Sequence, residues 1–250
     1  MIKPFQERIA TLDISVFSGV PSQTTDADRR SLLAVQRAVA AAHRSYAYLE
    51  IGSHLGGTIQ PHLADPRCSR IFSLDPRPAA QPDDRRPGYI AHYENNSSQR
   101  MLEMLANARL GDTGRISCIE LDSSQVAPET IEPAPAIAFI DGEHTARAVL
   151  ADFNFCCRVL RPDGVVVFHD FSILYRTLFA MMHSWRRQKL PWAVVRLPDN
   201  LLAVFFDPAV PAADPWLATM QRRTSCNLLL FRLTALAKSF KRKLLKALVK

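Results

Sequence analysis

The segment that most restricts the fold of this chain is a short apolar strand that leads into a glycine-containing turn and a helix start. It runs from Tyr48 to Thr58. In an open α/β sheet, ligands bind outside the carboxyl ends of the strands, where the strand order reverses. Glycines let the backbone approach a ligand where a Cβ would intrude, and a helix N-terminus adds free N–H groups. The segment therefore predicts an α/β domain with a ligand pocket at this turn. A tight turn without a ligand is the alternative.

The acids beside this turn indicate what kind of ligand it binds. A second apolar run, Ile71–Leu74, ends in Asp75, where a carboxylate can accept two hydrogen bonds from a ribose diol. The glycines from Gly52 to Gly57 are spaced Gly-x-x-x-Gly-Gly, unlike the Gly-x-Gly-x-x-Gly of dinucleotide sites. Glu50 precedes the first glycine, and a buried carboxylate there disfavours a pyrophosphate. We therefore expect a cationic ligand that carries a ribose and lacks phosphate.

Two further apolar runs end in polar residues. Ala136–Ile140 is followed by Asp141, and Val165–Phe168 is followed by His169 and Asp170. If the two runs are adjacent parallel strands, both acids reach the same edge of the sheet, and this is the edge at which the ligand is expected to bind. Acids that end buried strands usually face a cation or a substrate. The sequence therefore predicts a second group of functional residues at this edge.

In these motifs the chain resembles the class I S-adenosylmethionine-dependent methyltransferases, and within them the metal-dependent O-methyltransferases of small molecules and sugars. The resemblance covers roughly Val35 to Phe206. It rests on motifs in the same order as in that family: Tyr48–Thr58, Ile71–Asp75, Ile140–His144 and Gly164–Asp170. It implies an α/β fold with a doubly wound, mostly parallel seven-stranded sheet, helices on both faces and an antiparallel last strand.

The resemblance also implies how individual residues would bind S-adenosylmethionine. Glu50 would meet the amine of the methionine end, the backbone near Gly52 the carboxypropyl end, and Asp75 the ribose. Asp122 would meet the adenine amino group with Ser123 beside it, although Asp122 could instead cap a helix. The remaining cofactor-binding residues are expected at the same turn and strand end, namely Ser53, Gly56, Gly57 and Asp141.

Methyl transfer to an oxygen requires a group that removes the acceptor proton. His144 is the predicted general base, because an ordinary imidazole pKa of about 6.5 suits neutral pH; Glu143 is the alternative. A divalent cation, magnesium or manganese, held by Asp141, His169 and Asp170 would lower the pKa of the acceptor hydroxyl and orient it. Relatives carry an acid in place of His169, and imidazole suits softer metals. The alternatives are therefore manganese, iron or zinc, a vestigial site, or a His169 that only contacts Asp141.

We therefore expect an O-methyltransferase that acts on a hydroxyl of a sugar, a glycan precursor or another small polar molecule. The alternatives are a nicotinamide-dependent oxidoreductase, which the glycine spacing disfavours, and a non-catalytic methyltransferase-like protein that docks to a membrane or a partner. Five cysteines without a Cys-x-x-Cys pair, most of them in apolar segments, predict buried thiols in a reducing compartment. No apolar run reaches the roughly 18 residues of a spanning helix. We expect a cytoplasmic protein.

The chain divides by composition into three parts. We expect an N-terminal lid or loop segment at 1–24, the methyltransferase domain at 25–210, and a basic amphipathic helical tail at 211–250. Nine Lys and Arg residues and no acid follow Asp214, which leaves a net charge of −2 on the preceding residues. A nucleic-acid-binding cleft is therefore disfavoured. The tail could lie on an anionic membrane, on the inner surface, pack on the body or on a second copy in a homodimer, or bind RNA.

Several connecting segments carry local signals. Thr25–His43 has the apolar spacing of a helix, with Asp26 or Asp28 supplying negative charge at its start. Phe17–Ser22 is a loop that could act as a lid, and a helix is expected to open at Thr58. Pro76–Gly88 is rich in proline and charge, so we expect a surface loop without regular structure near the ribose.

Overall fold

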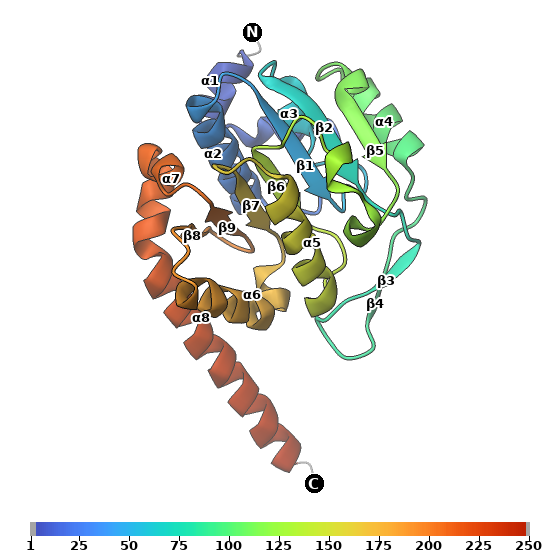
Figure 1. Cartoon of the computed structure of the whole chain (residues 1–250). Helices are drawn as coiled ribbons and strands as arrows, with labels where there is room; N and C mark the ends of the chain where they lie inside the picture. Colours follow the sequence, from blue (N-terminus) through green and yellow to red (C-terminus); the bar gives the residue numbers. More distant parts are fainter. Residues whose placement is uncertain (1–3, 249–250) are drawn as a thin grey trace.

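The computed structural model describes residues 4–248, with side chains up to Ala237. It is an α/β fold around a seven-stranded sheet of order β5-β2-β1-β6-β7-β9-β8 (Figure 1). The strands are β1 Tyr46–Ile51, β2 Cys68–Leu74, β5 Ile116–Ile119, β6 Ile137–Ile140, β7 Val165–Phe168, β8 Ala193–Arg196 and β9 Leu202–Phe205. Only β9 runs antiparallel to its neighbours within this sheet. The predicted fold class is confirmed.

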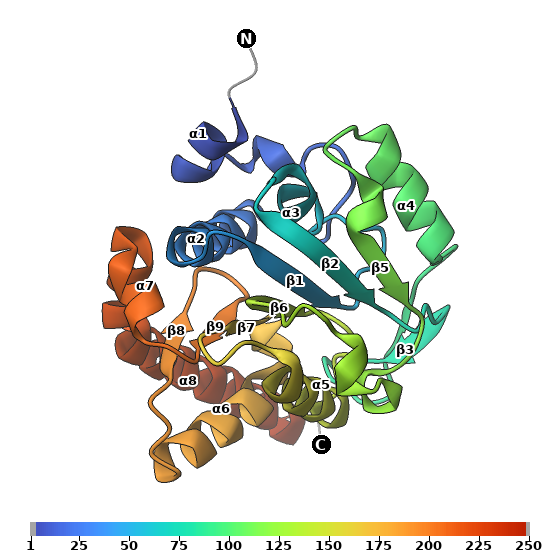
Figure 2. The same cartoon turned by 45° about the horizontal axis from the view of Figure 1, so that its top comes forward.

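The sheet is buried on both faces because its central strands are almost wholly apolar. Successive residues of a strand point to opposite faces. Tyr48 of β1 therefore packs in one core and Leu49 in the other. Helices α2 Asp26–Ala42, α3 Gln60–Ala64 and α4 Ser98–Asn107 cover the first face, while α5 Ala146–Val159 and α6 Phe171–Arg187 cover the second (Figure 2). The strand order reverses between β1 and β6, which puts the crevice of the sheet at the end of β1.

The segment before α2 is folded onto the first face. Helix α1 Phe5–Ala10 and a 3-10 helix, Ile14–Phe17, precede it, and Phe17 and Val20 are both buried. Thr25 is the N-cap of α2, and its hydroxyl and backbone N–H pair with Asp28 in a capping box. Of the two acids expected at this helix start, Asp28 is therefore the one that closes its first turn.

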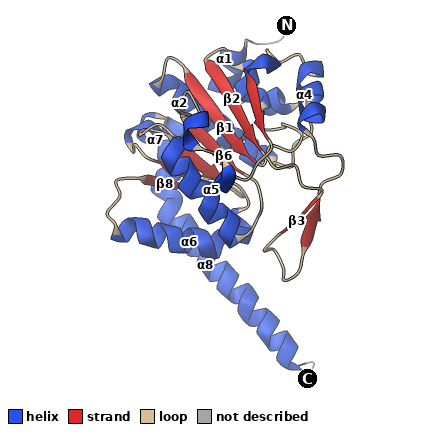
Figure 3. Cartoon of the chain, turned by 45° about the vertical axis from the view of Figure 1, so that its right-hand side comes forward, coloured by secondary structure: helices blue, strands red, loops and turns tan. Residues whose placement is uncertain are grey.

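The prediction of a loop without regular structure at Pro76–Gly88 is wrong at Ala80–Pro82. Strand β3, Ala80–Pro82, pairs antiparallel with β4, Ile90–His92, and this hairpin stands apart from the main sheet (Figure 3). A two-stranded ribbon has only edges, so a proline is tolerated in it. The helix expected to open at Thr58 begins instead at Gln60, because the Thr58 hydroxyl is turned inward to Glu50.

Helices α7 Ala209–Ala213 and α8 Pro215–Leu248 follow the sheet. The first half of α8 covers the edge strand β8, with Leu217 and Leu228 buried. The Thr224 hydroxyl accepts the backbone N–H of Arg196 at 2.9 Å, which satisfies a donor of that edge. The second half of α8 projects from the body (Figure 1). Within the described residues, no helix has the length and apolar character needed to cross a bilayer.

The cysteines only partly follow the prediction of buried thiols. Cys68 and Cys156 are buried and Cys118 is half-buried, whereas Cys157 and Cys226 are exposed. All five thiols are free. The prediction was wrong for Cys157 and Cys226 because each lies on the outward side of an amphipathic helix.

Candidate active site

A cavity of about 340 Å³ opens at the carboxyl ends of β1, β2 and β6. The hairpin strand β3 and the segment before α2 complete its walls. It is lined by most of the residues predicted to bind the cofactor or to carry the chemistry: Glu50, Gly52, Ser53, Gly57, Asp75, Asp122, Ser123, Asp141, Glu143 and His144. The folded chain thus brings together residues from four separate segments. His169 and Asp170 lie just beyond this lining, against Asp141 and His144.

At each glycine of the turn, neighbouring atoms lie too close to leave room for a Cβ. Gly52 has a φ of +87°, and a Cβ added to it would collide with the Asp141 carbonyl. A Cβ on Gly57 would collide with the carbonyl of Pro21, in the segment predicted as a lid. Gly56, with φ +79°, does not line the cavity, and its Cβ would meet α4 side chains at 2.9 Å. Gly56 is therefore a packing position, whereas Gly52 and Gly57 form the cavity wall.

Glu50 is a buried carboxylate at the end of β1. It is 1% exposed, and accepts hydrogen bonds from the Tyr48 hydroxyl at 2.6 Å and the Thr58 hydroxyl at 2.5 Å. Burial raises the pKa of its carboxyl to about 8. Ser53, also in the cavity wall, is 3% exposed, and its Oγ has no hydrogen-bond partner in the part of the chain that is described. A buried polar atom needs a partner, so both side chains are suited to a polar, cationic ligand.

Asp75 ends β2 and is held in place by its neighbours. Its Oδ2 accepts the backbone N–H of His54 at 2.9 Å, and its Oδ1 accepts that of Arg77 at 2.8 Å. The Arg77 guanidinium lies 3.4 Å from Oδ2. Each carboxylate oxygen has room for a further hydrogen bond. Asp75 is therefore pre-oriented to accept two ligand hydroxyls.

Asp122 and Ser123 start a 3-10 helix, Ser123–Gln125, beside the cavity. Asp122 is its N-cap residue, as the alternative expectation had it, and its N–H donates to the Gln125 side chain at 3.2 Å. Ser123 donates a 2.6 Å hydrogen bond to Asp152 of α5. Burial raises the pKa of Asp152 to about 6. Asp152 was not predicted from the sequence. The one sign of it there is an acid on the otherwise apolar side of the helix at Ala146–Val159.

A cluster of imidazole and carboxylate groups lies at the end of β6 and borders the cavity. Ligand atoms of Asp141, His144 and Asp170 all lie within 4.8 Å of one another. His144 Nε2 is 3.0 Å from Asp170 Oδ2 and 3.4 Å from Asp141 Oδ1. His169 Nδ1 is 2.8 Å from Asp141 Oδ1 and 3.6 Å from Asp170 Oδ2. Both imidazoles therefore face the two acids. The three residues whose ligand atoms lie together are Asp141, His144 and Asp170, so His144 stands where His169 was predicted.

The charges in this cluster compensate one another. Burial opposes ionisation of Asp141, yet His169 and His144 hold its pKa well below the usual range. Burial likewise opposes protonation of His144, but Asp141 and Asp170 raise its pKa to about 9. The pKa of His169 is raised further still. Two protonated imidazoles thus neutralise the acids, and a divalent cation could take over that task by displacing protons.

Two carboxylates of the cluster come from segments that sequence reasoning did not connect with it. Asp83, in the turn after β3, places Oδ2 2.9 Å from His144 Nδ1. Asp28, at the start of α2, places Oδ2 3.6 Å from His169 Nε2. Nothing local in the sequence marks either acid, since one lies in a charged loop and the other in a helix start.

The comparisons with known proteins agree with this architecture. Residues 49–171 match a family model described as a methyltransferase domain. An uncharacterized protein of Acanthamoeba polyphaga mimivirus is 23% identical over 163 residues, which cover 64% of this chain. They cover 63% of that relative, so the chain spans less than two thirds of its length.

Two solved structures show the same fold at low identity. The calicheamicin methyltransferase CalS11 has a TM-score of 0.52 at 16% identity, covering 82% of this chain and 94% of its own. A cofactor-bound protein, Rv0187 from MTB, has a TM-score of 0.50 at 14% identity, covering 82% and 90%.

Proposed function

We propose a function on the premise that this chain belongs to the class I S-adenosylmethionine-dependent methyltransferases. It methylates a hydroxyl oxygen of a sugar, a glycan precursor or another small polar molecule. One observation carries the proposal: a single cavity is lined by a buried carboxylate, Glu50, and a ribose-type acid, Asp75. The same cavity is lined by an imidazole, His144, beside two further acids.

The cofactor residues have distinct tasks in this proposal. Glu50 receives the ammonium of S-adenosylmethionine, which offsets the cost of the buried carboxylate. The backbone at Gly52 and the unpaired Ser53 hydroxyl receive the carboxylate end. Asp75 binds the ribose hydroxyls, and Asp122 with Ser123 lies along the adenine. The fit rests on the Ser53 Oγ, which has no hydrogen-bond partner among the described residues, and on the place of Gly52 in the cavity lining.

The transfer itself is an in-line displacement at the methyl carbon. S-adenosylmethionine supplies an activated methyl group, whose bond to sulfur breaks as its bond to the acceptor oxygen forms, with the electron pair leaving on sulfur. His144 Nε2 takes the hydroxyl proton. Glu143 is the weaker candidate, because its carboxylate already accepts a 2.6 Å hydrogen bond from Thr145. The protein holds the acceptor in line with the methyl group and excludes water.

A divalent cation fits the acids of this site. Asp141 and Asp170 would hold it, with the imidazole of His169 as a further ligand and that of His144 left free as the base, and it would lower the pKa of the acceptor hydroxyl. Manganese suits a set with an imidazole better than magnesium does. With their charge engaged by the cation, Asp141 and Asp170 would stabilise the protonated form of His144 less, and the imidazole could then act as a base.

Calorimetry and acceptor screening test this proposal together. The protein should bind S-adenosylhomocysteine, and labelled methyl should pass from S-adenosylmethionine to a member of a panel of hydroxylated sugars and glycan precursors. Tight binding of NAD with no binding of S-adenosylhomocysteine would overturn the proposal in favour of an oxidoreductase. Cofactor binding with no transfer to nitrogen, carbon or oxygen acceptors would favour a non-catalytic role.

Binding of S-adenosylhomocysteine should depend on pH through Glu50. Below its pKa of about 8 the carboxyl is protonated, whereas the ligand ammonium favours the carboxylate, so binding expels a proton. Affinity should therefore rise as pH rises, by about tenfold from pH ~6 to ~7, and level off near pH ~8. Titration calorimetry in buffers of different ionisation enthalpy measures both the affinity and the proton released. Glu50→Gln should bind more weakly and without this dependence; a pH-independent wild type contradicts the role given to Glu50.

We also propose that α8 docks on an anionic membrane surface. Leu229, Leu233 and Leu236 are 58%, 54% and 67% exposed and recur at helical spacing. They lie on a different side of α8 from Leu217 and Leu228, which pack on the body. This apolar stripe is thus not covered by the described residues of the body.

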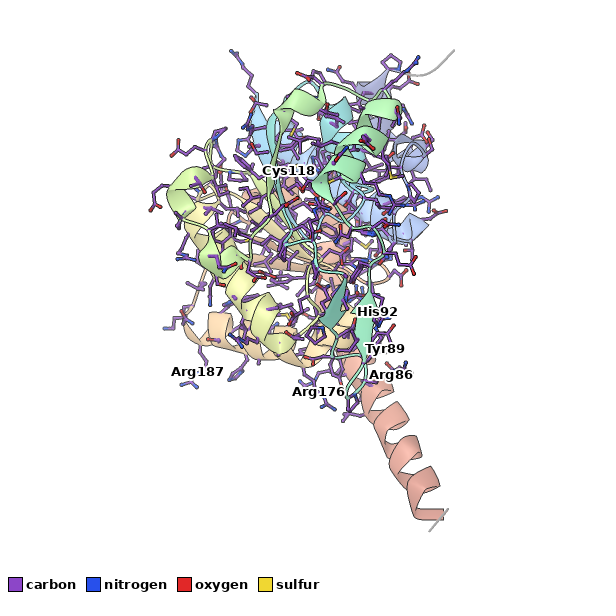
Figure 4. All side chains as sticks on the ribbon, turned by 90° about the vertical axis from the view of Figure 1, so that its right-hand side faces the viewer. Arg86, Tyr89, His92, Cys118, Arg176 and Arg187 are labelled. Carbon is purple, nitrogen blue, oxygen red and sulfur yellow. The ribbon has the colours of Figure 1, made fainter. Side chains whose placement is uncertain are left out.

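Basic residues surround the apolar stripe. Arg222, Arg223 and Arg232 lie on the described part of α8, and Arg86, Arg176 and Arg187 lie at the end of the body from which α8 projects (Figure 4). The rest of the predicted tail has side chains outside the described residues: Lys238, Phe240, Lys241, Arg242, Lys243, Leu244, Lys246, Leu248 and Lys250. Apolar and basic groups side by side suit the interface of an anionic bilayer. We place the protein in the cytoplasm, on the inner membrane surface.

A vesicle sedimentation experiment tests the membrane proposal with the full chain. The wild type should sediment with phosphatidylglycerol vesicles and less with phosphatidylcholine vesicles. Salt should weaken the association, because each Lys or Arg near the surface contributes about 1 kcal/mol. Leu229→Asp/Leu233→Asp should remain in the supernatant yet keep its S-adenosylhomocysteine affinity. Equal sedimentation of both proteins removes the proposal, and a dimer that the double variant dissolves would assign the stripe to a second copy.

A further inference from the structure

Asp83 is a buried acid in an otherwise exposed hairpin. It is 4% exposed, whereas β3 and β4 on either side are exposed or half-exposed. Its Oδ1 accepts the Arg85 backbone N–H at 2.8 Å and the Arg85 Nε–H at 3.0 Å. Its Oδ2 lies 2.9 Å from a terminal nitrogen of Arg85 and 2.9 Å from His144 Nδ1. Arg85 thus offsets the burial of this carboxylate and keeps it ionised.

The hairpin is tied to the loop after β6 by the backbone as well. The Asp84 N–H donates to the His144 carbonyl at 2.9 Å, and Asp84 Oδ2 accepts the Ala146 N–H at 2.9 Å. The Gln81 side chain donates to the Gly142 carbonyl at 3.2 Å. His144 is therefore held twice by the hairpin, at its main chain by Asp84 and at its ring by Asp83.

We infer that Asp83, in the turn of the β3–β4 hairpin, is a positioning residue for His144. Asp83 contacts Nδ1 of the ring, and this contact fixes the ring so that the opposite nitrogen, Nε2, faces Asp141 and Asp170. This inference rests on the proposed methyl transfer, since it assigns to Asp83 the task of presenting Nε2 to the acceptor hydroxyl.

The neighbouring acid provides a matched control. Asp84 belongs to the same turn and also ties the hairpin to the loop, but its carboxylate contacts the Ala146 N–H rather than the imidazole. If the hairpin served only to hold the loop after β6 in place, losing either carboxylate would lower kcat equally. If Asp83 orients the imidazole, only the loss of the Asp83 carboxylate lowers kcat.

The experiment compares Asp83→Asn with Asp84→Asn in the full chain. Asp83→Asn should lower kcat by about 10- to 10³-fold, because an amide orients an imidazole less firmly than a carboxylate does. The KM values and the S-adenosylhomocysteine affinity should stay within about twofold, since the cofactor contacts lie on other strands. Asp84→Asn should keep nearly all of the wild-type kcat. In nitrogen-15 spectra of histidine-labelled protein, assigned with His144→Gln, only Asp83→Asn should change the protonation pattern of the His144 ring nitrogens.

Either of two results overturns the inference. The first is equal kcat in Asp83→Asn and wild type, or equal losses in the two asparagine variants. The second is a wild-type spectrum in which His144 Nδ1 carries no proton at the pH where the ring is neutral. The affinity for S-adenosylhomocysteine shows that the variants are folded. Failure of the proposed function is a separate result, since a wild type without methyl transfer still yields the ring spectrum that tests Asp83.

Discussion

Asp141→Asn and Asp170→Asn are each expected to lower turnover by about 10³-fold or more, because a divalent cation that supplies several kcal/mol loses a charged ligand. Chelation of the wild type should cause a similar loss, and added manganese or magnesium should restore the activity. Affinity for S-adenosylhomocysteine should change little in Asp170→Asn, since Glu50 and Asp75 lie on other strands. Turnover with labelled cofactor, before and after chelation, measures this.

A surface acid provides the control for that experiment. Asp163 forms an ion pair with Arg161, at 3.0 Å, in the turn before β7, far from the cavity lining. Asp163→Asn should therefore behave as wild type does, with or without chelator. Full activity after exhaustive chelation would remove the cation from the proposal and leave His144 to act alone. Different losses in Asp141→Asn and Asp170→Asn would mean that they do not serve the same ion.

His144→Ala is expected to reduce kcat by about 10²- to 10⁴-fold, the usual contribution of a positioned general base. The cofactor affinity should be retained, because the residues proposed to bind the cofactor, Glu50 and Asp75, lie on other strands. Single-turnover measurements with saturating cofactor separate the transfer step from binding.

Glu143→Gln distinguishes the two candidate bases. Its carboxylate is engaged by the Thr145 hydroxyl, the N-cap of α5, so Gln should keep most of the activity. Full activity in His144→Ala together with a large loss in Glu143→Gln would transfer the role of base to Glu143. Full activity in both variants would mean that neither side chain removes the proton.

Much of the fold could be predicted from local patterns. The apolar runs at Tyr48–Ile51, Ile71–Leu74 and Ile137–Ile140 are strands because residues buried on both faces of a parallel sheet must be apolar throughout. The sequence also predicts that the acids Glu50, Asp75 and Asp141 lie at one edge of the sheet, because each ends one of these strands. In a parallel sheet all carboxyl ends meet there, so chain order alone brings these side chains into one cavity.

Other features could not be predicted, because they depend on how segments far apart in the chain pack. The hairpin at Ala80–His92 forms from two strands of only three residues each, one of which ends in a proline, and it is held by contacts with the loop after β6. The helix start at Asp28 faces His169, 141 residues later, only because α2 packs beside the end of β7.

Taken by itself, the sequence determined which residues end the strands and therefore which acids reach the cavity, because strand periodicity and burial are encoded locally. Tertiary structure alone decided the partners of those residues. Asp83 lies 61 positions before His144 and Asp152 lies 29 after Ser123, and nothing in either separation indicates a contact. Such pairs form when loops and helices pack and direct two side chains to one point, and their direction depends on the whole core rather than on any local pattern.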